Sequence, residues 1–170
     1  MLNFNKKVVF ITGATGGIGR ATAIKLANLG ADLILTDMNE DALLTLKNEL
    51  LDTGVSINVS VLDVSDEQRC THFLASVCNQ EQAGIDALIH CAGIYPEVMV
   101  KDMAAKQWQE LMQVNLNGTF NICKSVLPYL NDNSAIVNLS SVAGHKGSYA
   151  HAHYSASKGA VTSFSKSLGL

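Results

Sequence analysis

The sequence has few charged residues, no basic cluster and no long apolar run, and each shortage excludes a class of protein. Charged residues make up 16% of the chain of 170 residues, and its net charge is −3. Such a charge distribution gives little support to binding of nucleic acid or of an anionic membrane surface. No apolar run reaches the length of about 20 residues that a membrane-spanning helix needs. The early apolar run at residues 8–11 is interrupted by glycines too soon for a signal peptide. We therefore expect a cytoplasmic protein.

Cysteine is present without the spacing of a metal site or a disulfide framework. The chain has four cysteines, Cys70, Cys78, Cys91 and Cys123. Because no two of them form a Cys-x-x-Cys pair, we expect reduced and mostly buried thiols. The pair His151 and His153 has no carboxylate or thiol beside it, which makes it weak as a zinc site. No metal is predicted, and these histidines are expected at the rim of a functional site.

Apolar runs alternate with helical patterns along the chain, with no internal repeat and no low-complexity linker. The runs predict strands near residues 7–12, 32–37, 56–62, 85–90 and 135–140. The segments between and after them predict helices near 17–29, 40–52, 66–80, 107–130 and 153–168. Alternation of this kind is typical of a parallel sheet with helices on both faces. Right-handed crossovers give the strand order 3-2-1-4-5, so we expect one α/β domain over residues 1–170 with a three-layer αβα Rossmann fold.

A glycine cluster separates the first predicted strand from the first predicted helix. Its sequence is Gly13-Ala14-Thr15-Gly16-Gly17-Ile18-Gly19. The free N–H groups and the dipole at a helix amino end attract a pyrophosphate, and glycines let it approach the backbone. The spacing, Gly-x-x-x-Gly-x-Gly, differs from the Gly-x-Gly-x-x-Gly dinucleotide fingerprint, but the mechanism is the same. A glycine turn without a ligand is the alternative, and the strand and helix around the cluster favour a nucleotide site.

Asp37 narrows the choice of nucleotide. It ends the second apolar run and lies about 20 residues beyond the glycine cluster, the offset at which a carboxylate meets the ribose hydroxyls of adenosine. A carboxylate at this position repels a 2′-phosphate. Met38 and Asn39 follow, so no basic side chain stands where a phosphate clamp is expected, and Arg20 is the one basic residue nearby. The sequence therefore favours NAD, with NADP as the less favoured alternative.

Tyr154 and Lys158 have the i, i+4 spacing that places two side chains on one helix face. Bringing a tyrosine from its ordinary pKa of about 10 to about 7 requires about 4 kcal/mol of preferential stabilisation of the phenolate, which a fixed ammonium can largely supply. A tyrosine of this kind is a usable general acid and base. Alone the spacing is weak, because a tyrosine lying on a lysine stem at a helix surface gives the same pattern.

Together the motifs resemble the short-chain dehydrogenase/reductase family, from Val8 to the last residue. The motifs are Thr12–Gly19, the pair Asp63 and Val64, Asn115 within residues 114–120, Ser141 within residues 140–144, and Tyr154 with Lys158. The resemblance implies that the glycine motif, Asp37, Met38, Asp63, Val64, Cys91, Ala92, Gly93, Tyr154 and Lys158 contact the cofactor.

The resemblance also implies a catalytic tetrad. By this analogy Tyr154 transfers the proton, Lys158 holds the nicotinamide ribose and lowers the tyrosine pKa, Ser141 orients the substrate oxygen, and Asn115 helps to position Lys158 through water. The implied activity is NAD-dependent interconversion of a secondary alcohol and a ketone, with a 3-oxoacyl reductase or a related carbonyl reductase as the closest type. The substrate is then a small carbonyl or alcohol compound, and the implied assembly is a homo-oligomer.

Two departures from the family pattern leave alternatives open. His90 and Cys91 stand where the family usually has two asparagines, so amide contacts near the site are lost. The chain also covers about two thirds of a usual member, and the sixth and seventh strands are absent. We expect residues 135–139 to form a free apolar sheet edge that another chain covers. A dinucleotide-binding fragment with little turnover and a non-enzymatic interaction protein that keeps only the fold are the alternatives to an active enzyme.

Overall fold

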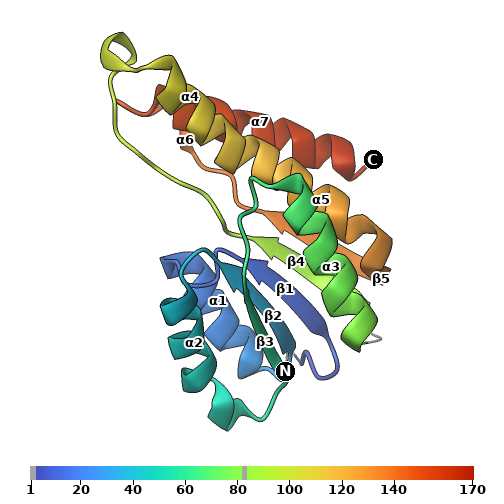
Figure 1. The fold of residues 1–170 in the computed structure, drawn as a ribbon. Helices are drawn as coiled ribbons and strands as arrows, with labels where there is room; N and C mark the ends of the chain where they lie inside the picture. Colours follow the sequence, from blue (N-terminus) through green and yellow to red (C-terminus); the bar gives the residue numbers. More distant parts are fainter. Residues whose placement is uncertain (1–2, 82–83) are drawn as a thin grey trace.

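The computed structural model describes residues 3–81 and 84–170 of the chain. Its centre is a parallel sheet of five strands in the order β3-β2-β1-β4-β5, with helices on both faces (Figure 1). The strands are β1 (Val8–Thr12), β2 (Asp32–Asp37), β3 (Ile57–Val61), β4 (Ile85–His90) and β5 (Leu130–Asn138). The predicted fold class and strand order are confirmed.

Seven α-helices of the described residues surround this sheet. They are α1 (Gly17–Ala27), α2 (Glu40–Glu49), α3 (Glu67–Glu81), α4 (Ala105–Met112), α5 (Gly118–Val126), α6 (Ala143–Lys146) and α7 (Ala152–Leu168). Short 3-10 turns cover Leu51–Thr53, Val100–Asp102 and Leu127–Tyr129. The four-residue helix α6, which the sequence did not predict, carries the chain from Ser141 towards α7.

The hydrophobic core lies on both faces of the sheet, as alternation along a strand requires. Val9 and Ile11 of β1 pack on one face with α1 and α2, where Leu43 is fully buried. Phe10, between them in β1, packs on the opposite face with α3 and α5, where Ile122 is fully buried. The partly buried end of α7 joins this second face. The three layers hold the carboxyl ends of the strands at one common edge, towards the top of Figure 1.

The predicted helix over 107–130 is wrong in one respect, because it is not continuous. α4 ends at Met112, a π-helical turn covers Gln113–Asn117, and α5 follows from Gly118. π-Helical turns insert an extra residue and are common at functional sites. α5 ends at Val126 and Pro128 lies in the 3-10 turn that follows, because a proline has no N–H group with which to continue the helix.

β5 begins earlier than predicted and forms one edge of the sheet. Ile85 of β4 pairs with Leu130, and the next paired residues are Ala87 and Ala135, so the register shifts between them. Asn133, inside this irregular segment, has a φ of 61°, a left-handed conformation that asparagine tolerates better than most residues. In the described residues β5 pairs with β4 alone, so the predicted free edge is present.

Candidate functional site

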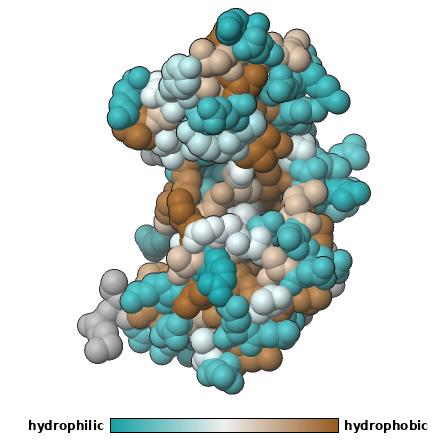
Figure 2. All heavy atoms as spheres, turned by 90° about the vertical axis from the view of Figure 1, so that its left-hand side faces the viewer, coloured by the Kyte–Doolittle hydropathy of each residue, from teal (hydrophilic) through white to brown (hydrophobic). Residues whose placement is uncertain are grey.

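A cleft of about 460 Å³ lies at the carboxyl ends of β1, β2, β3 and β4. Ten of the predicted cofactor residues line it, namely Gly13, Thr15, Gly16, Asp37, Met38, Asp63, Val64, Cys91, Ala92 and Gly93. Figure 2 faces this side of the molecule and shows it hollowed at mid-height, with hydrophobic side chains exposed there. The cleft lies beside β1, where the strand order reverses direction, which is the usual ligand position in an open α/β sheet.

Close backbone packing requires glycine at two positions of the glycine cluster, Gly13 and Gly19. Gly13 has a φ of 63°, and a Cβ there would meet the Ala92 nitrogen at 2.6 Å. A Cβ on Gly19 would meet the Gly13 oxygen at 2.1 Å, so the turn lies directly against the first turn of α1. Gly17 has no atom within 4 Å of such a Cβ and leaves the approach to the helix amino end open. This cradle fits a dinucleotide, whose pyrophosphate would lie at the amino end of α1.

Asp37 has a defined orientation at the edge of the cleft. Its carboxylate accepts hydrogen bonds from the Thr15 N–H at 3.0 Å and from the Met38 N–H at 2.7 Å. Asp63, at the end of β3, accepts from the Ser65 N–H at 2.9 Å. Both carboxylates are thus held by neighbouring backbone groups, and both face the cleft where an adenosine ribose and base would bind.

The remaining predicted cofactor residues do not line this cleft. They are Gly17, Ile18, Gly19, Tyr154 and Lys158. Leu62, Ile94 and Val114 line it and were not among the predicted cofactor residues. Each of these apolar residues is next to a predicted site residue in the sequence. That adjacency is the feature of the sequence that could have identified them.

Lys158 joins this cleft to the predicted catalytic residues. Its side chain is buried, with 7% of the residue exposed, and Nζ donates to the Leu139 carbonyl at 2.7 Å. Nζ lies 5.7 Å from the centroid of the Tyr154 ring and 3.8 Å from the position of a Cβ added to Gly93. Burial lowers the pKa of the Lys158 ammonium, while the nearby Cys91 opposes this shift. The predicted i, i+4 pair is therefore formed on α7.

Asn115 lies in the π-helical turn and is fully buried. Its side-chain oxygen accepts from the Ile94 N–H at 2.8 Å, and its side-chain nitrogen donates to the Ile94 carbonyl at 2.9 Å. The same nitrogen lies 3.4 Å from the hydroxyl of Ser157, the residue before Lys158. Asn115 thus fixes the loop after β4 against α7, and its predicted water-mediated relation to Lys158 stays a prediction.

Ser141 and Tyr154 line one pocket of about 230 Å³. The other residues around it are Tyr95, Val142, Ala143, Lys146, Gly147 and Ser148. α6 and α7 approach closely beside this pocket, because a Cβ on Gly144 would meet the Gly159 nitrogen at 2.6 Å. The Ser141 hydroxyl oxygen accepts from the Ala143 N–H at 3.1 Å, which leaves the hydroxyl hydrogen free to donate. The structure therefore brings Ser141 and Tyr154 to a common cavity.

Tyr95 is a member of this site that the sequence motifs did not identify. Its ring stacks on the His151 imidazole with centroids 3.9 Å apart and planes 3° apart. The same ring packs edge-on against Tyr154, with centroids 4.4 Å apart and planes at 76°. His151 and Tyr95 thus form an aromatic wall behind Tyr154, and His151 is buried, with 9% of the residue exposed, rather than at the expected rim. His153 lies inside, fully buried, and neither ring nitrogen has a hydrogen-bond partner among the described residues.

His90 supports the end of β4, where the family pattern has an asparagine. Its Nδ1 lies 2.6 Å from the Thr12 hydroxyl, and Thr12 and His90 are paired across β1 and β4. The Thr12 hydroxyl also lies 3.4 Å from the Ala92 N–H. Burial, and to a smaller extent Lys158, lowers the pKa of His90 to about 3. The neutral imidazole and the Thr12 hydroxyl therefore share a hydrogen bond that ties β1 to the end of β4.

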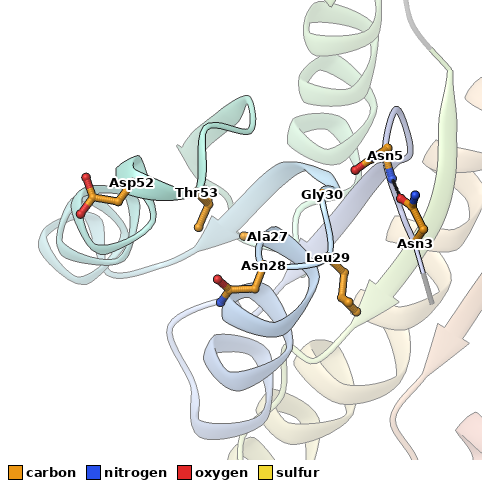
Figure 3. A pocket seen from close by; sticks show the side chains of 8 residues that line it. All are labelled: Asn3, Asn5, Ala27, Asn28, Leu29, Gly30, Asp52 and Thr53. Carbon is orange, nitrogen blue, oxygen red and sulfur yellow. Dashed lines mark hydrogen bonds between the residues drawn. The ribbon is translucent and has the colours of Figure 1, made fainter. Parts of the chain in front are cut away.

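Other features of the described residues lie outside this site. A pocket of about 550 Å³ lies at the opposite end of the sheet and is lined by residues 3, 5, 27–30, 52 and 53, whose side chains are neutral except Asp52 (Figure 3).

The four cysteines are free, and burial raises the pKa of Cys70 to about 12 and of Cys123 to about 11. Within residues 3–81 and 84–170 no group of three or more metal-ligating side chains is gathered. No described helix is long and apolar enough to cross a bilayer.

Curated proteins with similar sequences include reductases and oxidoreductases. A 3-oxoacyl-[acyl-carrier-protein] reductase of Thermotoga maritima is 35% identical over 94% of the chain and 65% of its own length. An uncharacterised oxidoreductase of Staphylococcus epidermidis is 32% identical over 99% of the chain and 72% of its own length. The chain thus spans about two thirds of the length of these curated relatives.

Solved structures with similar sequences share the fold. A short-chain dehydrogenase/reductase from Brucella melitensis, described as a glucose/ribitol dehydrogenase, superposes with a TM-score of 0.93 at 35% identity over 98% of this chain and 70% of that one. An NAD+-bound xylitol dehydrogenase superposes with a TM-score of 0.91 at 34% identity over 97% of this chain and 64% of that one. The family model for short chain dehydrogenases matches residues 7–170. The chain belongs to the short-chain dehydrogenase family.

Proposed function

We propose that the protein is an NAD-dependent oxidoreductase that interconverts a secondary alcohol and a ketone, as a 3-oxoacyl reductase or a related carbonyl reductase. The observation that carries the proposal is the position of Tyr154. Its ring lies 5.7 Å from the Lys158 ammonium and lines a pocket shared with Ser141. Lys158 and Gly93 in turn connect this pocket to the glycine-lined cleft.

The residues of the chain take separate roles in this proposal. When bound, NAD supplies the acceptor or donor of hydride. In ketone reduction Tyr154 gives its phenolic proton to the carbonyl oxygen, and the Ser141 hydroxyl donates a second hydrogen bond to the same oxygen. Lys158 stabilises the phenolate that remains, because its ammonium is held on the Leu139 carbonyl near the ring. Asn115 keeps the loop after β4 and α7 in register, so that these groups stay in place.

Asp37 supports NAD as the preferred cofactor. Its carboxylate is held on two backbone N–H groups at the edge of the cleft, where it would accept ribose hydroxyls and repel a 2′-phosphate. Met38, the following residue, brings no positive charge to the cleft. Ala92 and Gly93 line the floor of the cleft, where their small side chains would allow the cofactor to approach the backbone closely.

Turnover of Tyr154→Phe tests the proposal. NADH oxidation with 3-oxobutanoyl thioesters and simple ketones should fall by about 10²-fold or more, because general acid catalysis contributes about 10²–10⁴-fold. Tyr149→Phe is the matched control, since Tyr149 is 80% exposed and does not line the pocket. Equal rates for the wild type and Tyr154→Phe would refute the role proposed for Tyr154.

A dinucleotide-binding protein with little turnover is the second candidate. The observation that favours it is the open substrate pocket, where Val142 and Tyr95 are 65% and 55% exposed. Substrate positioning can contribute several kcal/mol to lowering a barrier, and an open pocket positions a substrate poorly. NAD binding in calorimetry without turnover of any carbonyl compound would support this candidate.

A further inference from the structure

We propose that the substrate of this site is a small anion, a carbonyl or alcohol compound whose carboxylate or phosphate group binds Lys146. The inference rests on the proposed oxidoreductase function and adds the chemical class of the substrate. It starts from the pocket that Ser141 and Tyr154 share. Of the described residues that line this pocket, Lys146 is the only one with a formal charge.

The charge of the surrounding segment supports an anionic ligand. Residues 133–170 contain no Asp or Glu, although the whole chain has a net charge of −3. The same residues contain three lysines, Lys146, Lys158 and Lys166. A site lined by one sign of charge raises the local concentration of ligands of the opposite sign. Glu110, on α4, lines a neighbouring pocket on the other side of Tyr95 and does not line this one.

The backbone around Lys146 leaves room for an anion. Lys146 is the last residue of α6, and Gly147 follows with a φ of 77°. No atom lies within 4 Å of a Cβ added to Gly147, so the approach to the pocket is unobstructed there. Ser148 lies two residues after Lys146 and also lines the pocket, so its hydroxyl adds a hydrogen-bond donor to the same lining. The close contact of Gly144 with Gly159 holds this segment against α7, the helix that carries Tyr154.

These positions give the substrate two points of attachment. The reacting oxygen would lie at Ser141 and Tyr154, and the anionic group would lie at Lys146 and Ser148. A pocket of about 230 Å³ encloses roughly eight non-hydrogen atoms at about 30 Å³ for each water-sized group, and a larger anionic group can extend past Lys146, which is exposed. Acetoacetate, a 3-oxo acid, has this size and carries its carboxylate close to the ketone, so it is a suitable probe.

The test compares matched charged and neutral substrates. In the wild type, kcat/KM with NADH is measured for acetoacetate and its methyl ester, and for hydroxyacetone phosphate and hydroxyacetone. In Lys146→Met the ratio of kcat/KM for the charged substrate to kcat/KM for its neutral partner should fall at least threefold. Lys146→Arg should restore most of this ratio. The wild-type ratio should also fall as ionic strength rises, because salt screens an exposed ion pair. The pair that shows the larger dependence on Lys146 identifies carboxylate or phosphate as the preferred group.

Binding supplies a readout that does not depend on turnover. Calorimetry with NADH and 3-hydroxybutanoate, a combination that cannot react, should show weaker binding in Lys146→Met, whereas the methyl ester should bind both proteins alike. Lys25→Met is the matched control, because Lys25 is exposed in the last turn of α1 and lies outside the pocket. Ratios and affinities that do not respond to Lys146 would overturn the inference. Unchanged turnover in Tyr154→Phe would instead overturn the proposed function, so the two failures are distinguishable.

Discussion

His90 is a buried titratable residue that should make the stability of the protein depend on pH. The residue is 3% exposed, its Nδ1 is bonded to Thr12, and Nε2 has no hydrogen-bond partner among the described residues. A protonated imidazole has no acidic partner there, and Lys158 adds a repulsive charge. The folded protein therefore keeps His90 neutral down to a pH of about 3, whereas an unfolded chain protonates it below about 6.5.

The sign of the resulting pH dependence follows from proton linkage. Between about 3 and 6.5 the unfolded state binds the His90 proton and the folded state does not, so stability falls as the pH falls through this range. The slope reaches at most about 1.4 kcal/mol for each pH unit. Urea unfolding of His90→Asn should show a shallower acid limb than the wild type. His72→Asn, an exposed change on α3, should keep the wild-type slope, and an equally steep limb in His90→Asn would contradict the argument.

Asp37 is the residue at which cofactor preference can be changed. In Asp37→Ser the carboxylate that faces the ribose is lost, and with it the repulsion of a 2′-phosphate. We expect the ratio of kcat/KM for NADH over NADPH to fall about tenfold, which corresponds to about 1.4 kcal/mol. Asp52→Ser, at the opposite end of the sheet, removes the same charge and should leave the ratio unchanged. A preference for NADPH already present in the wild type would contradict the proposed role of Asp37.

At the scale of elements, the contact between α6 and α7 places Ser141 beside Tyr154. A Cβ on Gly144 would lie 2.6 Å from the Gly159 nitrogen, so Gly144→Ala must move one backbone from the other. Overpacking of this kind usually destabilises a protein by about 1–3 kcal/mol. We expect this loss in urea unfolding and a lower kcat, because Ser141 and Tyr154 move apart. Gly169→Ala is the control, since its Cβ would have ordinary contacts of 3.6 Å and beyond, and comparable losses in both variants would argue against the contact.

The elements differ in how far the sequence could predict them. The strands at 7–12, 32–37 and 85–90 were found because buried parallel strands appear as short β-branched runs. The π-helical turn around Asn115 has no such pattern. It depends on tertiary contacts, namely the bonds of Asn115 to Ile94 and the approach of Gly118 to within 2.8 Å of the Val64 side chain if a Cβ were added. The spacing of apolar residues along the sequence therefore cannot predict the π-helical turn.

The same distinction applies to the candidate site. The glycine turn and the pair Tyr154 and Lys158 could be read from spacing, because local backbone geometry decides them. Tyr95 reaches Tyr154 from a loop 59 positions away in the numbering of the sequence. Its stacking on His151 is set by how the loop after β4 lies against the segment before α7, where Val98 N–H donates to the Ala150 carbonyl at 2.8 Å. Contacts between distant loops of this kind follow from the fold as a whole.

At the scale of the whole molecule, the two edges of the sheet differ in character. β5 exposes Ala135 and Val137, the latter to 48%, and has no outer partner among the described residues. A pocket of about 280 Å³ beside it is lined by the apolar residues Leu127, Leu130, Ile136 and Leu168 together with three polar residues and a glycine. Unpaired apolar edges recruit other chains. We therefore expect residues 1–170, studied as such, to associate with a second copy through the β5 edge in solution.

Val137→Lys tests this expectation, because a lysine on an edge strand opposes pairing with another chain. Sedimentation velocity should show an assembly larger than a monomer for the wild type and a shift towards monomer for Val137→Lys. Val61→Lys is the matched control, since Val61 lies on β3 at the opposite edge and is 42% exposed. Dissociation by Val61→Lys alone would assign the interface to the β3 edge. A stable monomeric wild type would contradict this expectation. It would show that Ala135 and Val137 of β5 stay exposed to solvent without a partner chain.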